Sequence, residues 1–145
     1  MDQLIQEMKV TLASTFSFYL KAHGFHWNVE GPNFPQYHEF LGDLWEEAFG
    51  AIDPIAEHLR TLGAYAPASF LRYKELSLIS DEVNIPAAMG MMNKLTADNA
   101  TIIEQLTKTQ SLAEKEKKMG LANFLQDRIG AHEKHGWQLR SITKG

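Results

Sequence analysis

Four side chains in this sequence have the types and spacing that divalent-metal chemistry requires: His26, His38, Asp53 and Glu57. Asp53 and Glu57 are four residues apart, so both carboxylates would lie on the same face of a helix. Carboxylate oxygens and neutral imidazole nitrogens together form a suitable ligand set for Fe(II). A more ordinary alternative is that Glu57 pairs with Arg60 on a solvated helix face.

The spacing along the chain divides these four residues into two halves. His38 precedes Asp53 by 15 residues on the same expected helix, a separation of roughly 22 Å at 1.5 Å per residue. One ion cannot contact both residues within one chain. His26 stands near the end of the preceding helix, so an antiparallel hairpin would bring it close to His38. A twofold axis between two chains could then set the histidine half of one chain against the carboxylate half of the other.

The elements that must position these residues are helices. Apolar residues recur at spacings of three and four almost throughout the chain, and no segment shows a strand pattern. The long helices are expected at about residues 3–28, from the Gly31–Pro35 break to Gly63, from Ile85 onward with Pro86 in the first turn, and from Met119 to Ile142. The linker at 63–84 is long enough to cross a bundle and could hold a short helix at Phe70–Leu76. This plan predicts an all-α, ferritin-like four-helix bundle.

Composition limits the class of protein. The 145 residues suit a single domain over 1–145, and a formal net charge of −4 disfavours binding to nucleic acid by electrostatics alone. The chain has no cysteine, which excludes disulfides and thiolate metal sites. No apolar stretch approaches a membrane span, and the N-terminal residues lack the pattern of a signal peptide. We therefore expect a cytoplasmic protein.

Three sequence runs together resemble the signature of the Dps proteins, or mini-ferritins. They are His26-Trp27-Asn28-Val29-Glu30-Gly31-Pro32-Asn33-Phe34, then Tyr37-His38-Glu39, then Ile52-Asp53-Pro54-Ile55-Ala56-Glu57. The similarity extends over essentially the whole chain. It implies a bundle with a short helix in the crossover, twelve subunits in a hollow shell, and Fe(II) oxidised by hydrogen peroxide or oxygen before storage as ferric mineral. It also implies that the ferroxidase ligands are His26 and His38 of one chain with Asp53 and Glu57 of its partner.

An ordinary ferritin would instead hold two iron ions inside one bundle, using Glu-x-x-His pairs. No glutamate in this sequence has a histidine three residues later, which favours the site between subunits. Members of the Dps family often carry an aspartate at the position of Gly42, so we expect a weaker second iron position. Replacing Gly42 by Asp should tighten that position at little folding cost, because glycine is a poor helix residue.

Several other residues, near the expected site and in the last helix, carry expectations of their own. Pro54 lies inside the second long helix and should kink it beside Asp53. His23 shares the helix face of His26, and Trp27 and Trp45 are expected near the site or, for Trp45, in the core. In the last helix, Trp137 could pack in the core. His132 and His135 are expected at the surface or at an interface.

Three functions remain open from the sequence. The leading one is a ferroxidase and iron store. The second is a structural protein that compacts DNA, although twelve chains at −4 each would give a shell of about −48, and no lysine-rich tail is visible outside the helical pattern. We therefore expect no appreciable DNA binding. The third is a helical assembly whose metal site is inactive or holds zinc.

Overall fold

The computed structural model describes the whole chain, residues 1–145, and most of it is helical. The helices are α1 (Asp2–Asn28), α2 (Phe34–Thr61), α3 (Phe70–Leu76), α4 (Ala88–Lys115) and α5 (Met119–Thr143). No strand is present. The all-α bundle and the short helix in the crossover are confirmed.

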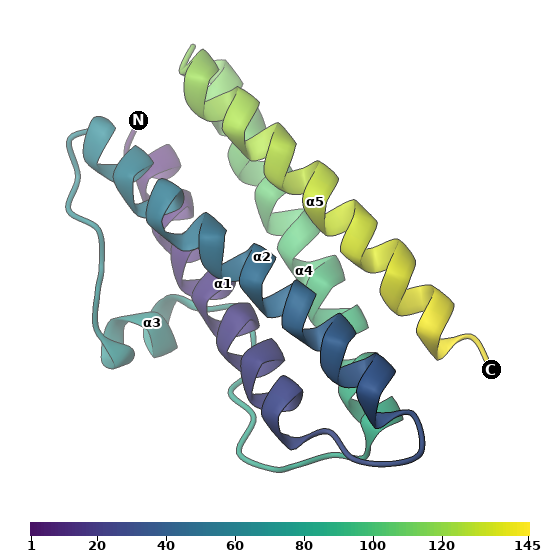
Figure 1. Ribbon diagram of the computed structural model, residues 1–145. Helices are drawn as coiled ribbons and strands as arrows, with labels where there is room; N and C mark the ends of the chain where they lie inside the picture. Colours follow the sequence, from purple (N-terminus) through teal and green to yellow (C-terminus); the bar gives the residue numbers. More distant parts are fainter.

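Two helical hairpins make up the bundle (Figure 1). Helices α1 and α2 pack along their length, as do α4 and α5, and α1 also packs against α4. Direct contact between α2 and α5 is sparse. The crossover between α2 and α4 runs along the outside of α1, from one end of the bundle to the other, and α3 rests on α1 midway. The expected crossover is therefore confirmed.

Local signals set the ends of the helices beside the candidate site. Helix α1 ends at Asn28, and the following Val29 is extended. Gly31 has a φ of +120°, which a side chain would strain, and this residue reverses the chain before α2. Helix α2 continues through Pro54 and ends at Thr61. Gly63, with a φ of +86°, follows it and turns the chain into the crossover.

The expected start of the third long helix is wrong. Helix α4 begins at Ala88, and Ala87 is its N-cap residue, so Ile85 and Pro86 precede the helix. Ile85 is exposed and contributes nothing to the core. Ile85 matches the helical spacing of the apolar residues, although it precedes the helix.

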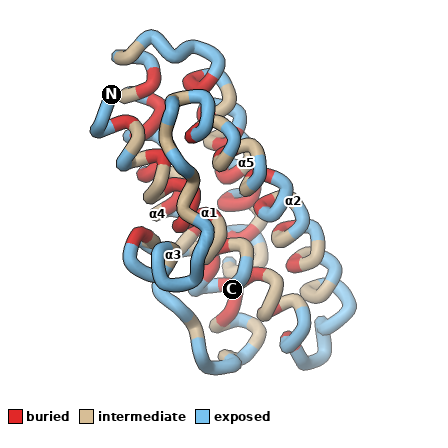
Figure 2. The backbone as a smooth tube through the Cα atoms, turned by 90° about the vertical axis from the view of Figure 1, so that its left-hand side faces the viewer, coloured by how far each residue is buried: buried red, intermediate tan, exposed pale blue.

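The core lies between the four long helices (Figure 2). Its fully buried side chains come from all of them and include Leu12, Phe18, Leu41, Ile55, Leu95, Ile102, Leu125 and Leu139. The crossover is mainly exposed. None of the helices is both long enough and apolar enough to cross a membrane.

Candidate metal centre

The two histidines of the first half-site are in direct contact where α1 meets α2. The His26 and His38 rings stack with their centroids 3.8 Å apart and their planes 13° apart. Each histidine binds the other's backbone: His26 Nδ1 lies 2.7 Å from the His38 carbonyl oxygen, and His38 Nδ1 lies 2.8 Å from the His26 carbonyl oxygen. The short turn between α1 and α2 makes this reciprocal arrangement possible.

These two hydrogen bonds determine which nitrogens remain available. A carbonyl oxygen can only accept, so Nδ1–H donates in both rings. In a neutral ring, Nε2 then carries the lone pair, and a hydrogen bond from Nδ1–H to a carbonyl is the usual way in which a metal-binding histidine is oriented. His26 and His38 are each half-exposed. The pair therefore presents two oriented Nε2 ligands at the surface of the subunit.

Two neighbours sandwich the stacked rings. Phe34 stacks on His38 with centroids 5.0 Å apart. On the other side, a β carbon added at Gly42 would lie 3.1 Å from His26 Cε1 and 3.3 Å from His26 Nδ1. In Gly42→Asp, the His26 ring would therefore have to move by a few tenths of an ångström to admit the new β carbon, and the low folding cost of this substitution stays a prediction. At this position, glycine allows α2 to approach the His26 ring closely.

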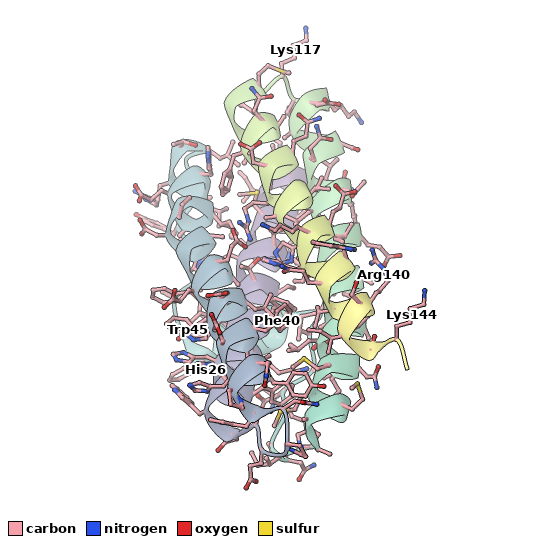
Figure 3. The ribbon with its side chains drawn as sticks, turned by 45° about the vertical axis from the view of Figure 1, so that its right-hand side comes forward. His26, Phe40, Trp45, Lys117, Arg140 and Lys144 are labelled. Carbon is pink, nitrogen blue, oxygen red and sulfur yellow. The ribbon has the colours of Figure 1, made fainter.

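An aromatic cluster adjoins the pair on the same side of the bundle. The His23 ring is stacked on Trp45, with centroids 3.8 Å apart, and its Nδ1 lies 2.9 Å from the Tyr19 hydroxyl. Trp27 covers the other side of His23 at 4.0 Å. Burial and the charge of His26 lower the pKa of His23, so it is neutral at pH 7. Figure 3 shows His26 and Trp45 together on the α1–α2 side, away from Arg140 and Lys144.

Asp53 and Glu57 form the second half-site on α2. Both are exposed and stand one turn apart. Asp53 raises the pKa of Glu57, first through a hydrogen bond between the two side chains and then through its like charge. The alternative pairing of Glu57 with Arg60 is not present: Arg60 donates to the Ala64 carbonyl oxygen at 3.0 Å and lies over the Tyr65 ring. A cation would relieve the repulsion between the two carboxylates.

The structure brings the two residues of each half-site together, but within one chain the two half-sites remain apart. Within one chain, no group of three or more His, Asp or Glu side chains is placed to hold a metal ion. This agrees with the distance of roughly 22 Å that helix geometry gives between His38 and Asp53. Any site containing all four residues must therefore include a second chain.

The sequence analysis missed a second polar cluster at the centre of the bundle. Glu47 of α2 accepts from Arg128 Nη2 at 2.9 Å and from His135 Nε2 at 2.8 Å. His132 is fully buried, and His135 is 7% exposed, so their expected position at the surface or at an interface is wrong. Arg128, His132 and His135 lie on one face of α5 at spacings of four and three, and the adjacent Leu125 and Leu139 could have indicated that this face is buried.

Of the two tryptophans considered for the core, Trp45 packs against it while partly exposed, and Trp137 does not. Trp137 is 59% exposed, so core packing is wrong for it. Trp45 is half-buried against His23, and its Nε1 is a buried donor without a hydrogen-bond partner. The expectation that Trp45 lies near the histidines is confirmed.

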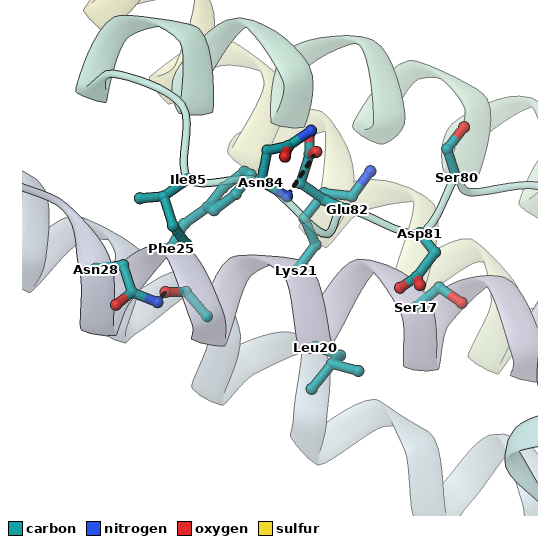
Figure 4. A pocket seen from close by; sticks show the side chains of 11 residues that line it. Ser17, Leu20, Lys21, Phe25, Asn28, Ser80, Asp81, Glu82, Asn84 and Ile85 are labelled. Carbon is teal, nitrogen blue, oxygen red and sulfur yellow. Dashed lines mark hydrogen bonds between the residues drawn. The ribbon is translucent and has the colours of Figure 1, made fainter.

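A pocket elsewhere has the wrong chemistry for a metal. It measures about 210 Å³, lies between α1 and the crossover, and contains no histidine (Figure 4). Lys21 at its base donates to Asp98 at 2.8 Å, and the Asn84 backbone N–H donates to Glu82. Glu82, one of the two carboxylates that line the pocket, also pairs with Lys94 at 2.8 Å. Without a histidine, the pocket lacks the ligand type that His26 and His38 supply.

Comparisons with known proteins agree with this fold. The profile of the ferritin-like domain matches residues 5–144. DNA protection during starvation protein 2 of Bacillus anthracis is 30% identical over 140 residues, covering 97% of this chain and 96% of that protein. The crystal structure of a Dps protein from Bacillus brevis superposes with a TM-score of 0.93 at 28% identity, covering 97% of this chain and 95% of that one.

A third relative adds the class of chemistry. The Dps protein of Vibrio cholerae O1 is described as a member of a broad superfamily of ferritin-like diiron-carboxylate proteins. It is 25% identical, covers 97% of this chain and 89% of its own, and superposes with a TM-score of 0.93. The fold defines a ferritin-like protein, and the chain belongs to the Dps family within that class. Iron storage and protection are the general functions of this family.

Proposed function

We propose that this protein oxidises Fe(II) at sites shared between two chains and stores the product as ferric mineral inside a hollow dodecamer. The observation that carries the proposal is the reciprocal bonding of His26 and His38. This bonding leaves two oriented Nε2 atoms at the surface of the subunit. No carboxylate of the same chain is placed to bind a metal ion together with them. A site that is half-built in this way needs a partner.

The carboxylate half supplies what the histidine half lacks. In the proposed dimer, Asp53 and Glu57 of a second copy face His26 and His38. The two carboxylates attract the hard divalent cation, and the imidazoles complete the ligand set while leaving positions open for the oxidant. Hydrogen peroxide accepts one electron from each of two Fe(II) ions. With two protons, it is thereby reduced to two water molecules. Oxygen is the alternative oxidant.

A mixing experiment tests whether the ligands are shared. One chain carries His26→Ala and His38→Ala, and the other carries Asp53→Ala and Glu57→Ala. Each parent should be inactive, because every site lacks one half. In a mixed dimer, one site has all four ligands and the other has none, so Fe(II) oxidation should partly return. Mixed shells that are verified to co-assemble and yet stay as inactive as the parents would refute the proposal.

The assembly has its own test. Light scattering should give a mass close to twelve chains of 16.4 kDa. A stable monomer would contradict both the shell and the shared site. No feature of the structure favours DNA compaction, and plasmid DNA should migrate unretarded beside the protein at neutral pH and physiological salt.

A further inference from the structure

The polar cluster at the bundle centre is built around a cation that belongs to the protein itself. Glu47 directs both carboxylate oxygens at the Arg128 guanidinium, accepting from Nη1 and Nη2. His132 Nε2 lies 3.2 Å from Arg128 Nη2. The other His132 nitrogen, Nδ1, lies 2.8 Å from Asn99 Oδ1, while Asn99 Nδ2 donates to the His132 carbonyl oxygen. The second hydrogen bond fixes the Asn99 amide with its oxygen towards the ring.

These contacts determine the protonation of His132. Its Nδ1 must donate to Asn99, so Nε2 carries a lone pair and accepts from Arg128. Burial first, and then the charge of Arg128, lowers the pKa of His132 well below its ordinary value. His135 completes the ring of groups by donating Nε2–H to Glu47. The guanidinium therefore lies between a carboxylate and a neutral imidazole, and a second imidazole is bound to the same carboxylate. Carboxylates and imidazoles are the groups that bind divalent transition metals in proteins.

We propose that Arg128 occupies a latent transition-metal site made by Glu47, His132 and His135, and thereby keeps divalent metal out of the bundle. The inference concerns residues separate from the two half-sites and does not depend on the proposed oxidation reaction. With Arg128 in place, no group of three or more His, Asp or Glu side chains is placed to hold a metal ion. The guanidinium supplies the positive charge that an ion would bring, and it repels any ion that approaches.

A route to the cluster is open in the structure. A pocket of about 230 Å³ between α2 and α5 is lined by Glu47, His135 and Asp43, with Lys134 at its rim. The Glu47 side chain is 37% exposed there, whereas the Arg128 side chain is 9% exposed. An ion can thus approach Glu47 from solvent, and a shorter residue at position 128 would leave room for it between Glu47 and His132. Asp43, one turn before Glu47, would add a second carboxylate beside it. Charge, rather than lack of access, is what excludes metal.

The test uses the assembled protein in which Asp53→Ala and Glu57→Ala have removed the carboxylate half-site. Arg128→Ala is added to this background, and Arg140→Ala, which removes an exposed arginine of the same helix, is the matched control. After incubation with Co²⁺ and removal of free ion, the Arg128→Ala protein should retain about one Co²⁺ per chain more than the control. Its visible spectrum should be that of Co²⁺ with nitrogen and oxygen ligands. Adding Glu47→Gln should abolish the extra Co²⁺.

Two results for the folded proteins count against the proposal. Equal Co²⁺ retention by the Arg128→Ala and Arg140→Ala proteins would overturn it, and so would extra Co²⁺ that survives Glu47→Gln. If Arg128→Ala prevents folding, the chain is refolded with and without Co²⁺. Folding only with Co²⁺ supports the latent site, because the ion then replaces the guanidinium. A chain that stays unfolded in both conditions shows that a metal cannot take the place of Arg128.

Discussion

Two pairs of histidines in this protein have opposite surroundings. At the surface, where α1 meets α2, His26 and His38 each bind one backbone carbonyl through Nδ1 and keep Nε2 free. At the bundle centre, both nitrogens of His132 are hydrogen-bonded, and His135 is held by Glu47. A pair of half-exposed rings that each keep Nε2 free can bind a substrate, whereas a buried ring that is bonded through both nitrogens, as His132 is, contributes to stability. The difference lies in the partners and not in the residue type.

The largest expected effect is a loss of activity without a loss of stability when the exposed carboxylates of α2 are removed. Asp53→Ala with Glu57→Ala should reduce the rate of rapid Fe(II) oxidation by at least about 100-fold, because the carboxylate half of the site is lost. Both side chains are exposed, so the melting temperature should stay within a few degrees of the parent. The measurements are the appearance of Fe(III) absorbance and thermal unfolding. A strong loss of stability with retained oxidation would reverse the roles that we assign to the two regions.

The opposite pattern is expected at the bundle centre. Arg128→Met should destabilise the fold by about 2–3 kcal/mol, because Glu47 and His132 are left without their partner. Urea unfolding measures this change. Fe(II) oxidation by the folded fraction should change much less than in the Asp53→Ala/Glu57→Ala protein. Unchanged stability would mean that the central cluster does not hold α2 and α5 together.

A smaller effect should sharpen the role of Gly42. In Gly42→Ala, the gain of about 1 kcal/mol in helix propensity is opposed by the contact at 3.1 Å with His26 Cε1. Binding of Zn²⁺ at the histidine half-site should weaken several-fold as the ring shifts. Gly50→Ala in the same helix is the control, because its β carbon meets nothing within 4 Å. The control should gain stability and keep its affinity, and equal affinities in the two variants would contradict the proposed contact.

The two smallest effects concern acid stability, and the first of them involves His132. The folded pKa of His132 is lowered from 6.5, so the unfolded chain binds a proton below pH 6.5 that the folded chain does not. The free energy of unfolding should therefore fall as the pH drops from 6.5 towards the lowered pKa. His132→Gln keeps a polar side chain and removes this proton, so its stability should depend less on pH between 6.5 and 5. Parallel pH profiles for the two proteins would show that another group causes the loss.

Glu47 acts in a lower pH window. Its folded pKa is lowered by hydrogen bonds from His135 and Arg128 and by their charges, although burial opposes the shift. Its stabilising contribution is therefore complete above its ordinary pKa of 4.5 and is lost below it. Glu47→Gln should remove part of the acid sensitivity below pH 4.5. A variant profile that is as steep as the parent's would contradict this.

Most of the fold could be predicted because the relevant interactions are local. The three- and four-residue spacing of apolar side chains indicates helices, and Gly31 and Gly63 mark two turns where φ is positive. The short helix at Phe70–Leu76 was predicted within the long linker, and the structure shows that Ser69 caps it, with its side chain accepting from the Arg72 backbone N–H at 3.2 Å. The start of α4 was missed because Ala87 provides no side-chain cap to mark it.

The sequence by itself determined the helices, the hairpin that brings His26 to His38, and the single face shared by Asp53 and Glu57, since all of these follow from residue spacing and chain reversal. Only the tertiary structure decided how the side chains are used. The hydrogen bonds of Glu47 reach residues 81 and 88 positions away, and the Gly42 backbone meets a ring on another helix. Periodicity identifies the face on which a residue lies, but it does not identify the group that stands opposite.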